Sequence, residues 1–245
     1  MQTRLAPASD LPRLRERLRA VFGAQTPPDR RLDPVSQLIK AVISSRTYDE
    51  VAWAAFIRLQ QAYPDWGALG DASAEAVEQV IDPVTFAEMK ARQLPTLIRT
   101  ILRRRGTLEL DFLGLETVEG AMAWLQGLNG VGITSAAATL NFSRLNRRTL
   151  VVDAHVARVA RRLGLIPAGG DENAAYDALM DQAPADWGPE DLHELHWLMK
   201  PYGQSICSHF DPACGLCALR GTCPRLGVAG DQEARVLAFK ARTLT

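Results

Sequence analysis

All four cysteines of this 245-residue chain lie in one short segment late in the sequence. Four thiolates supplied by so short a segment can surround a metal centre, as structural zinc and [4Fe–4S] clusters both require. Two disulfides are uncommon in a cytosolic chain, and unconnected buried thiols have no reason to cluster. The spacing C-x6-C-x2-C-x5-C therefore predicts a metal centre and leaves zinc and iron–sulfur open. The candidate ligands are Cys207, Cys214, Cys217 and Cys223.

The composition is that of a soluble globular protein, with 47% hydrophobic and 23% charged residues. No apolar run is long enough to cross a membrane, and the first residues lack the apolar core of a secretory signal. We therefore expect a cytoplasmic protein. Lys+Arg and Asp+Glu are both 28, so the neutral net charge argues against a strongly basic nucleic-acid binder without excluding a local basic surface.

Hydrophobic periodicity predicts helices along most of the chain and almost no strands, which indicates an all-α protein. Asp33-Pro34 is a helix start ahead of an apolar stripe that runs to Ile43. A helix is expected over residues 83–105, with a break at Pro95 because proline cannot donate the helical hydrogen bond. Further helices are expected over residues 117–126 and 133–145, separated by a glycine-rich turn.

That turn lies in Leu128-Asn-Gly-Val-Gly-Ile-Thr-Ser-Ala136, where Gly130 and Gly132 bracket Val131. Glycine lets the backbone approach a ligand closely, and a helix that starts near Ile133 presents free N–H groups to an anion. From these residues alone, a clamp for a phosphate and an ordinary turn between two helices are equally good interpretations.

Asp153, in Val152-Asp-Ala-His-Val156, comes directly before another helical pattern. An aspartate at this place can cap the helix by accepting hydrogen bonds from its first N–H groups. The same carboxylate can also face a cleft and place negative charge where a reaction develops positive charge. The two roles are compatible.

These three motifs, in the chain order hairpin, Asp153 and cysteine segment, resemble the endonuclease III family of DNA glycosylases over about residues 33 to 224. The resemblance makes a DNA phosphate the expected ligand of the hairpin. The resemblance implies an all-α, two-domain helix-hairpin-helix DNA glycosylase fold. A six-helix barrel with the hairpin would cover residues 33–146, and a helical [4Fe–4S] cluster domain would combine residues 1–32 with residues 147–245. The implied partner is double-stranded DNA that contains a lesion or mismatch, with a nucleoid association if the protein is bacterial. No membrane partner is expected, and the sequence does not indicate an obligate protein partner.

In the resembling enzymes the residue that matches Asp153 stabilises positive charge on the sugar as the base departs, and helps to activate the nucleophile. Bifunctional members carry a lysine two residues after the second hairpin glycine, and its amine forms a Schiff base with C1′. Thr134 stands at that position here, and a hydroxyl cannot form an imine. We therefore predict a monofunctional DNA glycosylase that removes a damaged or mismatched pyrimidine, with weak or no AP lyase activity.

Three other residues are candidates for contact with the DNA or the lesion. Lys40 lies at or within one position of a glutamate that adenine-removing relatives carry, so it is a catalytic candidate or a lysine that snorkels beside the apolar stripe. Arg46 aligns best with a family glutamine that fills the gap left by the extruded base, or is a solvated arginine at a helix end. His155 either contacts a phosphate or packs.

Two other functions fit the same residues. The departures from the family pattern at Thr134 and Arg46 favour a catalytically impaired protein that binds lesions or abasic sites, whereas the presence of Asp153 favours an enzyme. A lyase that uses Lys40 is the remaining alternative.

Overall fold

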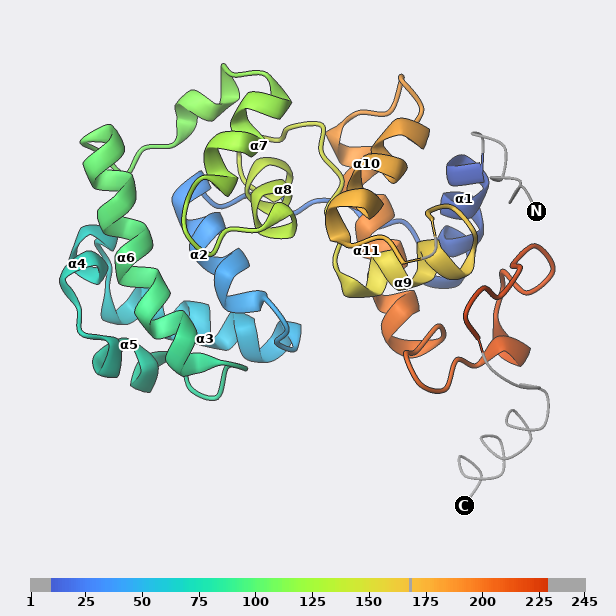
Figure 1. Cartoon of the computed structure of the whole chain (residues 1–245), viewed down its shortest axis with the longest axis horizontal. Helices are drawn as coiled ribbons and strands as arrows, with labels where there is room; N and C mark the ends of the chain where they lie inside the picture. Colours follow the sequence, from blue (N-terminus) through green and yellow to red (C-terminus); the bar gives the residue numbers. More distant parts are fainter. Residues whose placement is uncertain (1–9, 168, 229–245) are drawn as a thin grey trace. The chain divides into compact units, whose positions relative to one another are not determined.

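The computed structural model describes residues 10–167 and 169–228 (Figure 1). These residues form eleven α-helices, two short 3₁₀ helices and no strand, which confirms the predicted all-α class. None of the described helices is long and apolar enough to cross a membrane. The α-helices are α1 Asp10–Phe22, α2 Pro34–Ser44, α3 Asp49–Ala62, α4 Trp66–Asp71, α5 Ala74–Ile81, α6 Ala87–Arg105, α7 Val118–Gln126, α8 Ile133–Phe142, α9 Ala154–Arg162, α10 Glu172–Gln182 and α11 Pro189–Ser205, and the 3₁₀ helices are η1 Asp111–Gly114 and η2 Cys214–Leu216.

The chain divides into two compact units. The first, here called the hairpin unit, runs from Pro28 to Thr149 and contains α2 to α8. The second, here called the cysteine unit, combines the chain up to Pro27 with the chain from Leu150 onward. Its described helices are α1, α9, α10 and α11. Each unit buries a hydrophobic core of its own.

Helix α2 forms as its sequence predicts. The Oδ1 atom of Asp33 accepts hydrogen bonds from the backbone N–H groups of Val35 and Ser36, both at 3.0 Å. Pro34 stands at the first helical position, where its missing N–H costs nothing. The apolar stripe of α2 is buried, and the helix packs against α3 and α8. The helix start and its buried face are therefore confirmed.

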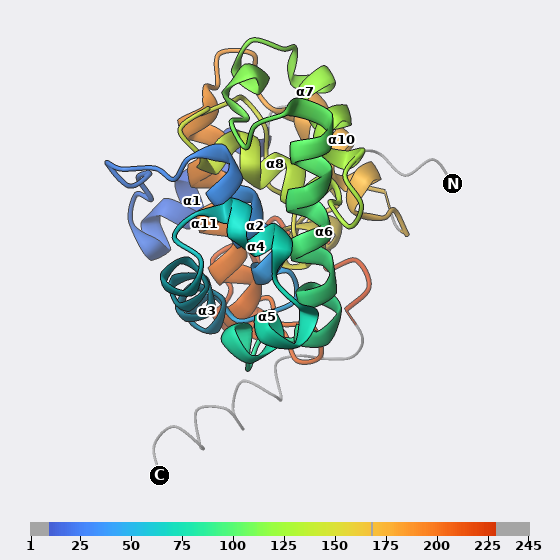
Figure 2. The same ribbon diagram turned by 90° about the vertical axis from the view of Figure 1, so that its left-hand side faces the viewer.

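Helix α6 differs from its prediction, because it begins at Ala87 and continues to Arg105 without a break at Pro95. Proline inside a helix costs about 3 kcal/mol. The flanking side chains of Leu94 and Leu97 are at most 2% exposed, and burial of each contributes about 1.5–3 kcal/mol. Packing of α6 along α4 and α5 (Figure 2) thus outweighs the lost hydrogen bond.

In the cysteine unit, helix α11 packs against both α1 and α9. Gly203 permits the close approach of α11 to α9. A Cβ atom at Gly203 would lie 3.0 Å from the Cβ of His155 and 3.1 Å from its carbonyl oxygen. The two helices therefore meet backbone to backbone at the turn that follows Asp153.

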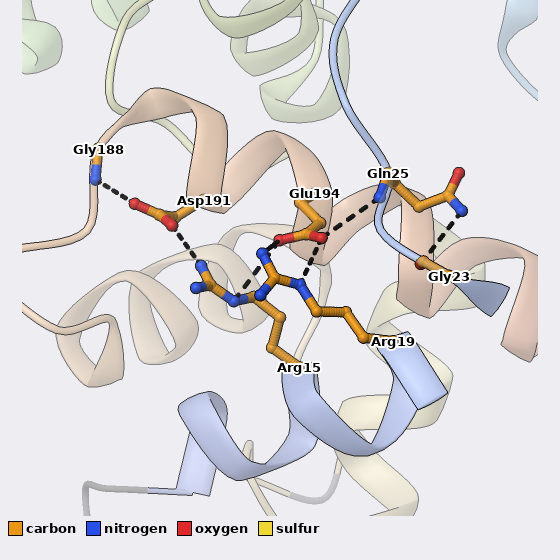
Figure 3. Close-up of polar contacts among 7 residues, drawn as sticks. All are labelled: Arg15, Arg19, Gly23, Gln25, Gly188, Asp191 and Glu194. Atoms are coloured by element: carbon orange, nitrogen blue, oxygen red, sulfur yellow. Dashed lines mark hydrogen bonds and ion pairs between the residues drawn. The ribbon is translucent and has the colours of Figure 1, made fainter. Parts of the chain in front are cut away.

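A buried carboxylate links α1 to α11 (Figure 3). Glu194 has a side chain only 6% exposed, accepts a hydrogen bond from Arg19 Nε at 2.6 Å, and lies 3.6 Å from Arg15 Nε. Asp191 pairs with Arg15 and accepts the backbone N–H of Gly188 at 2.8 Å, which caps the start of α11. Charge pairs therefore fix a helix from the beginning of the sequence against one from its far end.

Substitution of Glu194 by glutamine should lower the free energy of unfolding by about 2 kcal/mol, because it removes the buried negative charge that pairs with Arg19 and lies beside Arg15. Urea unfolding followed by circular dichroism measures the change. Glu16→Gln is the matched control, since Glu16 is an exposed carboxylate on α1 and its loss should cost no more than about 0.5 kcal/mol. Equal stability of the two variants would contradict the assignment.

Candidate functional site

The predicted hairpin connects α7 to α8, and α6 holds its carbonyl oxygens. Gly130 has a φ of +79°, a conformation that favours glycine. Gln93 Nε2 donates to the carbonyl of Gly130 at 2.8 Å, and Arg104 donates to the carbonyl of Gly127 at 2.8 Å. A Cβ atom on Gly130 would lie 2.1 Å from Gln93 Nε2 and would displace that side chain, so glycine suits both the positive φ and the bond from Gln93.

Gly132 has a different role. A Cβ atom there would meet nothing within 4 Å, and its φ of −84° suits any residue, so the fold alone does not require glycine. Gly132 is the residue before α8 and has no side chain with which to cap the helix. The buried side chain of Val131, which is 5% exposed, anchors the hairpin. Residues 126–132 line an open depression of about 510 Å³. The start of α8 is therefore accessible to an anion.

Thr134 lies in the first turn of α8 and is partly buried. Its hydroxyl is the reactive group that this position offers. No lysine lies within the hairpin from residue 126 to residue 136, so the chain supplies no amine there.

Asp153 caps α9. Its Oδ1 atom accepts the backbone N–H groups of His155 and Val156, each at 2.9 Å. Among the described residues, Oδ2 accepts no hydrogen bond, and the side chain is partly exposed. The cap thus fixes the direction of the carboxylate and leaves one oxygen for another partner.

His155 packs on Arg158 in the first turns of α9. A guanidinium group only donates, so the 3.0 Å contact of Arg158 Nη2 with His155 Nδ1 makes Nδ1 the acceptor and places the proton of a neutral imidazole on Nε2. Arg158 also donates to the carbonyl oxygens of Gly203, at 2.6 Å, and Cys207, at 2.9 Å. Burial lowers the pKa of Arg158.

Helix α9 and the cysteine segment are joined by a second arginine. Arg162 is 7% exposed and donates to the carbonyl oxygens of Ser208, at 2.6 Å, and His209, at 2.8 Å. It also lies 3.3 Å from Cys207 Sγ. Buried Tyr202 of α11 places its hydroxyl 2.9 Å from Cys217 Sγ, and burial raises the pKa of that phenol. The cysteine segment is therefore held by donors that suit thiolate sulfur.

All four cysteines are partly buried and none forms a disulfide. Burial raises the pKa of Cys214 and Cys223, and the neighbouring thiols raise both further. Four thiols so near one another favour a cationic centre, which would take the place of their protons. Within residues 10–167 and 169–228, however, no three potential ligands converge closely enough to hold a single metal ion.

The hairpin unit also contains Arg46 and Lys40. Arg46 is exposed just after α2, has a φ of +55°, and lies with Cζ 5.9 Å from the ring of Phe86. Phe86 is 53% exposed. Lys40 places Nζ 4.7 Å from the ring centroid of Trp53, a cation–π contact between α2 and α3.

Sequence reasoning missed Lys90, the 2% exposed lysine of α6. Its Nζ donates to the carbonyl oxygens of Ile43, at 2.7 Å, and Ser45, at 2.6 Å, and to Thr47 Oγ1, at 3.1 Å. Burial lowers its pKa to about 8. The scarcity of lysine in the chain was the only signal in the sequence, and it did not point to this position.

Comparison with known proteins identifies the family. The family model described as "HhH-GPD superfamily base excision DNA repair protein" matches residues 39–184, which is more than half of the chain. The chain belongs to the HhH-GPD superfamily. The matched region of this HhH-GPD protein includes the hairpin and Asp153 and ends before the cysteine segment.

Endonuclease III of Synechocystis sp. is 28% identical to the HhH-GPD chain over 191 residues, which cover 78% of the chain and 81% of that protein. Endonuclease III of Thermotoga maritima is 28% identical over 204 residues, with 83% and 88% covered. Against two longer relatives the chain spans less than two thirds of their length. It covers 64% of a DNA glycosylase of Arabidopsis thaliana and 62% of Endonuclease III-like protein 1 of Gallus gallus, each 27% identical.

Solved structures share the fold. A non-covalent endonuclease III–DNA complex matches with a TM-score of 0.74 and 22% identity. The match covers 92% of this HhH-GPD chain and 97% of the endonuclease III chain. A trapped covalent endonuclease III–DNA intermediate has a TM-score of 0.72 and 23% identity, with the same coverage. The predicted endonuclease III-like, all-α helix-hairpin-helix fold is therefore confirmed.

Proposed function

We propose that this HhH-GPD protein is a DNA glycosylase that hydrolyses the N-glycosidic bond of a damaged or mismatched pyrimidine. The observation that carries the proposal is the Asp153 carboxylate. Two backbone N–H groups hold Oδ1, so Oδ2 has a fixed direction, and it accepts no hydrogen bond among the described residues. A carboxylate with one oriented, available oxygen is suited to act on a developing cation.

The chemistry follows from charge. As the base departs, positive charge develops on the sugar, and a preorganised carboxylate stabilises it more strongly than water would. Asp153 would also accept a proton from the attacking water, because the available oxygen is a Brønsted base. The products are the free base and an intact strand with an abasic site.

Thr134 supports hydrolysis rather than strand cleavage. A Schiff base requires a primary amine, and the hairpin supplies a hydroxyl at the position where bifunctional relatives carry lysine. Water is then the nucleophile, and β-elimination has no imine from which to proceed.

Three features of the hairpin unit and α9 would bind the DNA. The open backbone at Gly130, Val131 and Gly132 and the start of α8 would hold a phosphate. Arg46, exposed and next to the aromatic ring of Phe86, would occupy the gap left by the extruded nucleotide. His155, which lies in the first turn of α9 and contacts Arg158, would bind a phosphate oxygen.

A panel of duplexes tests this function. Each duplex carries one uracil, one thymine opposite guanine or one oxidised pyrimidine, and is analysed with and without hot alkali after incubation. We expect strand cleavage only after alkali on at least one duplex. Binding to abasic DNA without any cleavage would instead support the lesion-binding protein that the Thr134 and Arg46 departures favour, and cleavage before alkali would support a lyase that uses Lys40.

We also propose that Cys207, Cys214, Cys217 and Cys223 hold a [4Fe–4S] cluster. The spacing of these cysteines resembles that of the iron–sulfur loop of the endonuclease III family. Arg162 lies 3.3 Å from Cys207 Sγ and the Tyr202 hydroxyl lies 2.9 Å from Cys217 Sγ, so donors are in place for the sulfur atoms that would hold the cluster. Its role would be structural, because hydrolysis of an N-glycosidic bond transfers no electrons.

Replacement of Cys217 by serine should remove the bound iron and lower Tm by about 10 °C, because the free energy of metal binding contributes to folding. Iron and sulfide content per chain, visible absorbance and thermal unfolding of anaerobically purified protein measure this. Ser205→Ala is the control, since Ser205 is exposed and lies close to the cysteine segment. Zinc in the wild-type protein, or full iron content in the variant, would contradict the assignment.

A further inference from the structure

Helix α6 makes polar contacts with two separate loops of the hairpin unit. One is the hairpin, and the other is the Arg46 loop, defined here as residues 44–48. We propose that Lys90 is a positioning residue that sets the Arg46 loop for lesion engagement, independently of the hairpin contact made by Gln93. The inference rests on the proposed function, because both loops are assigned there to DNA contact.

All three donors of the Lys90 ammonium are used by the end of α2 and the loop that follows it. The acceptors are the carbonyl oxygens of Ile43 and Ser45 and the hydroxyl of Thr47. Carbonyl oxygens at the end of a helix have no partner within the helix, so a cation there is favourable. Burial of a charged amine is costly, and only a complete set of acceptors offsets that cost.

Two of these acceptors flank Arg46. Ser45 and Thr47 are its chain neighbours, and both bond to the same nitrogen. Arg46 itself has a φ of +55°, a left-handed conformation that is unfavourable for a residue with a long side chain. The Lys90 contacts therefore hold a strained residue in place, with its guanidinium group directed toward Phe86, the residue before α6.

The hairpin contact is separate. Gln93 lies three positions after Lys90, on the same face of α6, and bonds to Gly130. Loss of Gln93 should loosen the hairpin, which contacts any duplex, whereas loss of Lys90 should loosen only the residue that fills a gap in a damaged duplex.

The test compares affinity for an undamaged duplex with affinity for the same duplex carrying a tetrahydrofuran abasic analogue. We expect Lys90→Met to lower the preference for the analogue about tenfold. This is the change in affinity that corresponds to losing the hydrogen bonds of one charged group. Affinity for the undamaged duplex should change less than about twofold. Thr47→Val, a milder change that removes one acceptor, should lower the preference in the same direction.

A double-variant comparison separates positioning from general stability. If Lys90 acts through Arg46, Lys90→Met combined with Arg46→Ala should lower the preference no further than Arg46→Ala alone. Gln93→Met should weaken both duplexes and keep the preference, and Lys200→Met on α11 is the control for loss of one lysine.

Additive losses in the double variant, or an unchanged preference in both Lys90→Met and Thr47→Val, would overturn the positioning role while leaving the glycosylase proposal intact. A wild-type protein without any preference for the analogue would overturn both.

Discussion

Asp153→Asn is expected to lower the rate of base removal by about a thousandfold with little change in stability. Asparagine caps helices about as well as aspartate, so its carbonyl oxygen can still accept the N–H groups of His155 and Val156. The substitution removes the negative charge and the proton acceptor and keeps the shape. Single-turnover rates on a duplex that the wild-type protein processes, together with thermal unfolding, measure the two effects separately.

Asp171→Asn is the matched control. Asp171 caps α10 by accepting the N–H of Ala174 at 2.9 Å, so the same chemical change is made at another helix start. We expect a similar small effect on stability and no effect on the rate. A full rate in Asp153→Asn would show that Asp153 is only a cap and would remove the basis of the proposed mechanism.

Thr134→Lys should convert a protein that forms no covalent intermediate into one that does. The wild-type hairpin offers a hydroxyl, so borohydride should trap no protein on the substrate duplex. A lysine at this place supplies an amine, and borohydride should then reduce the imine to a stable adduct that migrates as a shifted band. Strand cleavage without alkali should appear with it.

Ser135→Lys is the control for Thr134→Lys. Neighbouring positions on a helix point in different directions, so an amine at Ser135 should not reach the same atom. A strong adduct from the wild-type protein would contradict the monofunctional assignment, and its loss in Lys40→Met would then identify Lys40 as the nucleophile.

The local parts of the fold could be read from the sequence. Asp33 and Asp153 predict helix starts because their carboxylates can accept the first N–H groups of a helix. Gly130 predicts a turn that needs a positive φ. The four cysteines lie so close in sequence that their proximity in space follows directly. Each of these signals lies within a few residues of the feature that it specifies.

The distant contacts could not be predicted from the sequence. Nothing near Lys90 indicates that its amine bonds to residues more than forty positions earlier, and nothing near Glu194 indicates Arg19. Pro95 shows the same limit, because its local preference was overruled by the packing of α6 against other helices. Burial depends on the whole chain, so buried charges are the residues that a motif search misses.

Asp153 caps the beginning of helix α9, and Arg158 and Arg162 of the same helix donate hydrogen bonds to the cysteine segment. The segment proposed to bind the cluster therefore supports, through α9, the residue proposed to carry out hydrolysis. Loss of the proposed cluster would leave the Asp153 carboxylate intact but would remove the support that fixes its direction. The proposed hydrolysis would then depend on the cluster although it transfers no electrons.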